Sequence, residues 1–234
     1  NEKSSIKANY SRTRQYMQLA QNSTAGTPLD IWFPASPNVQ PQIADQVAVG
    51  FFKNFNKNMF ESSIEVYYKN LQNQIDYQNG AELILNKNVE SQLVFGEGRA
   101  FGTELFIKKR TGTLTGWIGY TLSKTERSIE EIDGGDWYPA KQDRTHDISI
   151  VTKYELNKKW SVSAIWVYNT GNAVTFPSGK YRVENFTVPA YTTRTGYRMP
   201  DYHRMDIGAT YTKKKRKNFE SSWSFSIYNL YGRK

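Results

Sequence analysis

Two histidines, His146 and His203, are the side chains of this sequence best suited to proton transfer. Asp143 and Asp147 lie close to His146 in the sequence, and Asp201 lies two residues before His203. A serine hydrolase needs a serine, a histidine and an acid that converge in space. Nothing in the spacing brings such a set together, so hydrogen bonding at strand ends is favoured over catalysis. We expect no catalytic residues and no enzyme activity.

Two charged segments suggest other chemistry, and each has a simpler interpretation. The acidic loop 130–136 is rich in oxygen ligands but lacks the spacing of an EF-hand, so a solvated loop is favoured over Ca²⁺. The basic run 213–217 suggests nucleic acid, yet it lies in a short turn between two amphipathic segments. The sequence has no cysteine, which excludes zinc bound by cysteine and thiol catalysis. We therefore expect no metal, no cofactor and no nucleic acid.

Aromatic side chains in the longer connections are the better candidates for ligand contact. The sequence has 16 Tyr, 12 Phe and 6 Trp, and aromatic faces stack on sugars and chelates while they stay partly wet. The candidates for ligand binding are Trp32, Trp137, Tyr138, Phe176, Tyr191 and Tyr202. Packing of the loops on themselves is the competing interpretation for each residue.

The elements that position these residues are strands, because apolar and polar residues alternate along most of the chain. Alternation with a period of two places the two sets on opposite faces of a strand. The nine predicted strands are 6–16, 43–53, 60–70, 99–109, 114–125, 146–156, 160–170, 203–212 and 219–227. The polar sides of these strands supply a second candidate set, which would face the interior of a barrel: Lys69, Glu104, Asp147, Arg204 and Asp206.

The connections between the predicted strands alternate in length. Short ones lie near 54–58, 110–114, 157–159 and 213–218, and long ones near 20–41, 78–98, 127–145 and 171–202. An up-and-down barrel that crosses a membrane has short turns on one side and long loops on the other. No apolar stretch approaches 18 residues, which excludes a transmembrane helix. The sequence predicts an all-β, antiparallel, up-and-down transmembrane barrel.

Two other classes of protein remain open at this point. A soluble carbohydrate-binding β protein shares the richness in tyrosine and tryptophan, but the alternating loop lengths argue against it. A small outer-membrane enzyme or adhesin would need a closed barrel with an even number of strands. Nine is odd, so we expect residues 1–234 to be a partial barrel domain of a larger barrel.

Seven stretches resemble the C-terminal barrel segment of TonB-dependent outer-membrane receptors, in the form common in Bacteroidetes. They are PQIADQVAVGFFKNF (41–55), FESSIEVYYKNLQNQIDY (60–77), GRAFGTELFIKKRTGTLTGWIGYTLSKTER (98–127), YPAKQDRTHDIS (138–149), GNAVTFPSGKY (171–181), YRMPDYHRMDIGATY (197–211) and SWSFSIYNLYGRK (222–234). The most specific of these are the G-x-x-x-G-x-E-L motif at 98–105, the GYTLS strand at 119–123 and the DRTHD motif at 143–147.

The resemblance implies a 22-stranded barrel in the bacterial outer membrane, closed by an N-terminal plug domain. The plug, the segment that contacts TonB and the last strand would be absent from residues 1–234. Such receptors import large, scarce ligands: iron chelates, cobalamin, glycans or peptides. The implied partners are TonB, the imported ligand and outer-membrane lipid with its lipopolysaccharide. A surface lipoprotein, as in relatives that take up glycans, is a further alternative.

Overall fold

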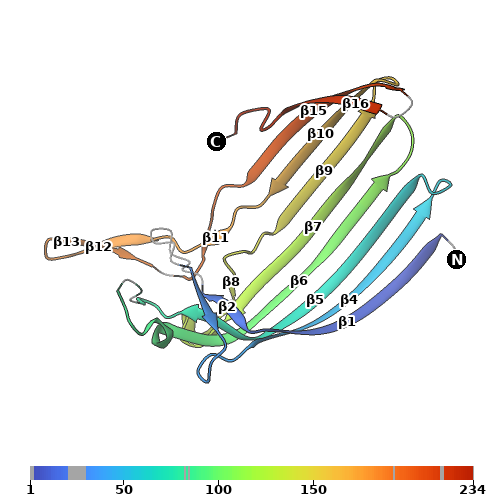
Figure 1. Ribbon diagram of the computed structural model, residues 1–234. Helices are drawn as coiled ribbons and strands as arrows, with labels where there is room; N and C mark the ends of the chain where they lie inside the picture. Colours follow the sequence, from blue (N-terminus) through green and yellow to red (C-terminus); the bar gives the residue numbers. More distant parts are fainter. Residues whose placement is uncertain are drawn as a thin grey trace.

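The chain forms one large antiparallel sheet, in which each long strand pairs with the next long strand along the sequence (Figure 1). The structure is a computed structural model that describes residues 3–20, 30–81, 83, 85–191, 193–216 and 219–233. Within these residues the sheet contains nine long strands, with one short strand added to its middle. The nine strands, in the order of their pairing, are β1 (Ser4–Gln15), β4 (Gln42–Phe55), β5 (Phe60–Tyr77), β6 (Leu93–Lys109), β7 (Leu114–Ser128), β9 (His146–Glu155), β10 (Trp160–Asn169), β15 (Tyr202–Arg216) and β16 (Phe219–Ile227).

All nine predicted strands are present, and the all-β antiparallel fold is confirmed. Short turns join β4 to β5, β6 to β7 and β9 to β10 at one end of the sheet, and the long connections gather at the opposite end (Figure 1). In the turn between β4 and β5, Asn56, Lys57 and Asn58 all have positive φ angles. Asparagine enters this left-handed region more easily than most residues, which suits a tight turn.

The pairing register divides the sheet into an apolar face and a polar face, because residues directly opposite each other share a face. Ile118 on β7 lies opposite Ile107 on one side and Ile150 on the other. The same face carries an apolar side chain from every other long strand; among these residues are Tyr10, Val47, Val66, Leu105, Trp166, Ile207 and Phe225. Most of these side chains are exposed, as a lipid-facing surface requires. We call this surface the outward face and the opposite one the inward face.

β5 and β6 extend furthest beyond their predicted bounds. They have 18 and 17 residues, so both continue toward the long loops past the roughly 9–11 residues that a membrane crossing needs. A register shift between Leu71 and Gln74, with Asn73 at φ 57°, marks the point where the extension begins. The bulge shifts which residues of β5 point to each face, so the alternation of apolar and polar residues with a period of two does not continue past it.

The long connections contain short elements of their own, which the sequence does not reveal. The strands are β2 (Met17–Ala20), β3 (Ile31–Pro34), β8 (Tyr138–Pro139), β11 (Ala173–Val174), β12 (Gly179–Val183), β13 (Phe186–Ala190) and β14 (Tyr197–Arg198), and the 3₁₀ helices are η1 (Val89–Gln92) and η2 (Asp133–Gly135). β12 and β13 pair as a hairpin that projects from the sheet (Figure 1). No helix in the described part of the chain has the length and apolar character to span a membrane.

The buried apolar side chains lie at the end of the sheet that carries the long loops. One cluster includes Ala20, Phe33 and Ile75, and a second includes Val94, Ile129 and Ile132. Both clusters are small, so other interactions must help to hold the long loops against the sheet.

Candidate functional site

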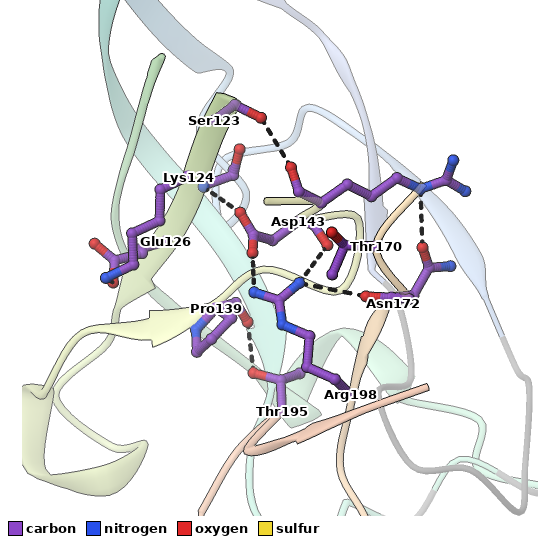
Figure 2. Close-up of polar contacts among 12 residues, drawn as sticks. Ser123, Lys124, Glu126, Pro139, Asp143, Thr170, Asn172, Thr195 and Arg198 are labelled. Atoms are coloured by element: carbon purple, nitrogen blue, oxygen red, sulfur yellow. Dashed lines mark hydrogen bonds and ion pairs between the residues drawn. The ribbon is translucent and has the colours of Figure 1, made fainter. Parts of the chain in front are cut away.

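Figure 2 shows the first of two buried charged groups that join the long loops to the sheet. Asp143, in the DRTHD motif before β9, is 1% exposed. Its carboxylate forms an ion pair with Arg198 on β14, and one oxygen accepts a hydrogen bond of 2.5 Å from the backbone N–H of Thr125. Arg198 also donates to the backbone carbonyls of Asp143 (2.9 Å) and Gly171 (3.3 Å). One arginine thus connects two long loops to the sheet at β7.

The second group centres on Asp76, near the end of β5. Arg127 Nη1 lies 3.7 Å from one carboxylate oxygen, and Arg194 Nη2 lies 3.4 Å from the other. All three side chains are at least nine-tenths buried. Tyr138 donates a 3.0 Å hydrogen bond from its hydroxyl to Asp76. The segment 193–198 therefore reaches across the end of the sheet to β5.

The position of Tyr138 differs from what a ligand contact requires. The side chain is 4% exposed, and burial, followed by the charge of Asp76, raises the pKa of its hydroxyl well above the usual range. Neighbouring Trp137 is 40% exposed, but its ring lies 4.0 Å from the guanidinium of Arg99, which belongs to the outward face. Sequence reasoning placed both aromatics in a long loop, and it had no signal for the direction in which each side chain points.

The other four aromatic candidates are exposed at the end of the sheet that carries the long loops. Trp32 lies on β3, and the Phe176 ring lies 5.4 Å from the Tyr197 ring. Tyr191 lines a cleft of about 560 Å³ between the end of β5 and the β12–β13 hairpin, together with Tyr181 and others. Tyr202 lies on the inward face, where it pairs with Asn169 of β10.

Tyr77 also lines this cleft. Its side chain is 3% exposed, and its hydroxyl has no hydrogen-bond partner among the described residues. Burial, followed by the charges of Asp30 and Asp76, raises the pKa of Tyr77 to about 12.

The five polar residues predicted from alternation all lie on the inward face. Glu104 is opposite Glu65 on one side and Thr121 on the other, and Thr121 is opposite Asp147. A shallow cavity of about 210 Å³ is lined by Glu104, Asp147 and their neighbours. The register places Lys69 on the same face, two repeats closer to the long loops than Glu65.

Arg204 and Asp206 form an ion pair on this face, with 3.0 Å between Arg204 Nη2 and the Asp206 carboxylate. The Arg204 guanidinium also lies 4.3 Å from the Tyr228 ring. The pair is partly exposed, so both charges remain in reach of a solute on the inward side.

The two histidines lie apart on the outward face and do not form a catalytic group. His146 Nδ1 is 2.9 Å from the Tyr120 hydroxyl, and His203 Nδ1 is 2.8 Å from the Tyr231 hydroxyl. Among the described residues, no three acids or histidines lie close enough together to share a metal ion. These contacts agree with hydrogen bonding at strand ends.

An apolar outward face, a polar inward face and loops sorted by length define an outer-membrane β-barrel wall. Residues 1–230 match the family model described as TonB dependent receptor-like, beta-barrel, and the chain belongs to that family. Comparison with curated protein sequences gave no match.

Three solved structures illustrate the similarity of fold. The ferric-catecholate import receptor Fiu of Escherichia coli is 17% identical with a TM-score of 0.62, and this chain covers 29% of it. The ferripyoverdine receptor of Pseudomonas aeruginosa is 14% identical with a TM-score of 0.65 and 28% covered. The FrpB iron transporter of Neisseria meningitidis is 15% identical with a TM-score of 0.62 and 33% covered. In each case all of this chain is matched, so it spans about a third of these receptors or slightly less.

Proposed function

We propose that residues 1–234 are the barrel wall of a TonB-dependent receptor that imports a large, scarce ligand across the outer membrane. The observation that supports this proposal is a sheet with an apolar outward face and a polar inward face, in a chain that belongs to this family. Such a wall separates lipid from a polar passage. An iron chelate is the proposed ligand, since the similar structures are described as receptors for ferric catecholate and ferripyoverdine. Cobalamin, a glycan or a peptide are the alternatives.

In this proposal the chain binds and guides the ligand but makes or breaks no bonds. A plug domain, a segment that contacts TonB and a closing strand lie outside residues 1–234, and TonB supplies the energy for transport. We further propose that the receptor is of the form common in Bacteroidetes, on the basis of the motifs at 98–105 and 143–147. A surface lipoprotein partner accompanies that form when the ligand is a glycan.

The proposed ligand contacts are the exposed aromatics Trp32, Phe176, Tyr191 and Tyr202. Tyr138 is left out because it is buried, and Trp137 because it stacks on an outward arginine. The ligand then passes along the inward face, where Lys69, Glu104, Asp147, Arg204 and Asp206 line the wall.

The test is uptake of radiolabelled iron chelates by cells that carry the full receptor, a receptor deletion or a TonB deletion. Uptake should require both the receptor and TonB. Tyr191→Ala should weaken chelate binding to the purified receptor about tenfold, whereas Tyr154→Ala should not, although both side chains are 47% exposed. Tyr154 is the matched control because it lies on the outward face near a short turn. Uptake that is independent of the receptor, or equal effects of the two variants, would contradict the proposal.

A further inference from the structure

The four short connections, with the strand residues beside them, carry the net positive charge of the chain. They are the segments 53–61, 108–114, 153–160 and 213–220. Together they hold 13 of the 31 lysines and arginines but only 3 of the 22 aspartates and glutamates, so their net charge is +10, whereas the rest of the chain is −1. The basic run 213–217 is thus one part of a larger basic group.

Most of these cations are exposed and form no ion pair among the described residues. Arg110 pairs with Glu61 at 2.6 Å, and Lys153 pairs with Glu155 at 3.3 Å. The cations without such a partner, of which all but Lys109 are exposed, are Lys53, Lys57, Lys108, Lys109, Lys158, Lys159 and Lys213. At the long-loop end, by contrast, the buried acids each hold a cation. The short-turn end is therefore a surface that attracts anions.

Aromatic side chains on the outward face mark the level of the membrane surface at this end. Two pairs have 5.1 Å between their ring centroids: Phe55 with Phe60, and Trp160 with Tyr211. Outer-membrane barrels carry girdles of aromatic residues at both interfaces. Lys57 lies in the turn that joins the first pair, and Lys158 and Lys159 lie in the turn directly before Trp160. These three lysines are therefore on the aqueous side of the apolar surface.

The basic turns form a row along the end of the sheet. Successive short turns are two strand spacings apart in the order of pairing (Figure 1). Neighbouring strands lie about 4.8 Å apart, so the turns follow one another at about 10 Å and the row spans about 30 Å. A single lipid headgroup contacts one turn, whereas a polymer with repeated negative charges meets several. Exposed ion pairs are individually weak, so an anion that engages several turns at once binds more tightly.

We propose that the basic short turns bind peptidoglycan through the carboxylates of its peptide stems. The proposal rests on the proposed function, which places the short turns in the periplasm, where peptidoglycan is the extended polyanion beneath the outer membrane. Lys57, Lys158 and Lys159 are the central contacts, because they are exposed at the turns and have no ion-pair partner among the described residues. The site lies at the opposite end of the sheet from the long loops, so its occupant differs from the imported ligand (Figure 1).

The test is co-sedimentation of the full receptor, purified in detergent, with insoluble peptidoglycan. The triple variant Lys57→Gln/Lys158→Gln/Lys159→Gln should lower the apparent affinity for peptidoglycan at least tenfold. The control variant Lys87→Gln/Lys180→Gln/Arg182→Gln removes three exposed cations from the long loops and should bind as the wild type does. Peptidoglycan with its carboxylates converted to amides should bind the wild type at least tenfold more weakly. Raising the salt from about 0.1 M to about 1 M shortens the screening length from about 10 Å to about 3 Å and should release the receptor.

Equal affinity of the two triple variants, or equal binding of native and amidated peptidoglycan, would overturn the proposal. Native mass spectrometry with phosphatidylglycerol tests the competing partner: a turn variant that loses this lipid but keeps peptidoglycan would assign the turns to lipid headgroups and also overturn it. A shift of the band on a gel without boiling verifies that each barrel is folded. If the triple variant does not fold, Lys158→Gln/Lys159→Gln serves, and it should still lower the affinity several-fold. Uptake of iron chelate is measured in parallel: uptake without peptidoglycan binding rejects only this inference, and peptidoglycan binding without uptake rejects only the proposed ligand.

Discussion

Replacing Ile118 with arginine tests the assignment of the two faces most directly. Ile118 is the middle one of the outward residues between Leu114 and Leu122 on β7, and isoleucines lie opposite it on both neighbouring strands. Arginine at the midplane of the lipid face of a barrel costs about 2–4 kcal/mol. Since 1.4 kcal/mol corresponds to a factor of ten, Ile118→Arg should lower the folding equilibrium about 30- to 700-fold.

The same substitution at Thr121 is the matched control, three residues along the same strand. Thr121 lies on the inward face, directly opposite Glu104 on one side and Asp147 on the other. Opposite charges across a strand pair contribute about 0.2–1 kcal/mol each. Thr121→Arg should therefore range from neutral to about 1 kcal/mol stabilising.

The assay is reversible unfolding of the full receptor in urea in the presence of lipid vesicles, followed by tryptophan fluorescence and by mobility on unboiled gels. The slope of the transition should be the same for both variants, so that the midpoints report stability. Equal destabilisation by the two variants, or a larger cost at Thr121, would refute the assignment of the faces.

Three further predictions concern the buried groups that hold the long loops. Arg198→Ala leaves the Asp143 carboxylate buried without its cation and should lower the free energy of unfolding by about 2 kcal/mol. This is less than for a fully buried pair, because the Arg198 side chain is one-third exposed. Hydrogen exchange in the loop around Arg198 should accelerate, and unchanged exchange would contradict the role of this pair. Asp76→Asn removes the carboxylate that pairs with two buried arginines and should cost about 3–5 kcal/mol locally, measured as faster proteolysis of the loops under native conditions. Tyr77→Phe removes a buried hydroxyl that has no partner among the described residues and should be neutral or about 1 kcal/mol stabilising at pH 7. The pKa of Tyr77 is about 12 in the folded chain and about 10 when unfolded, so the wild type should lose stability as the pH rises from 10 to 12. Denaturation measured at pH about 10 and about 12 should show a smaller loss of stability in the Tyr77→Phe variant, which lacks this hydroxyl.

The membrane-spanning part of the fold could be predicted from the sequence because lipid imposes a strict rule on it. Every second residue must be apolar, and the segments must be long enough to cross, so alternation alone located the nine strands. The same rule placed Lys69, Glu104 and Asp147 on one face before any pairing was known. Each of these predictions depends on neighbours within one strand.

The loop end could not be predicted in the same way, because its contacts join residues far apart in the sequence. Tyr138 meets Asp76 across 62 residues, and Arg198 meets the Asp143 carbonyl across 55. The DRTHD motif drew attention to Asp143, but nothing local identified Arg198 as its partner. The β12–β13 hairpin was missed for a different reason, since its strands have five residues each and show too little alternation to stand out.

Three acids at the loop end, Asp76, Asp143 and Glu126, are almost fully buried, and each is paired with at least one arginine. Buried ion pairs add little net stability compared with apolar packing, so stability alone does not account for them. Apolar clusters at this end are small, and they would allow a loop to shift without losing contact. An ion pair with several directed hydrogen bonds, such as Arg198 with Asp143, permits one arrangement. We infer that these groups fix the bases of the long loops, so that the exposed aromatics at their tips are presented in a defined position. Exchange in the Arg198→Ala variant tests this inference, since a loop held by apolar contacts alone would be unaffected.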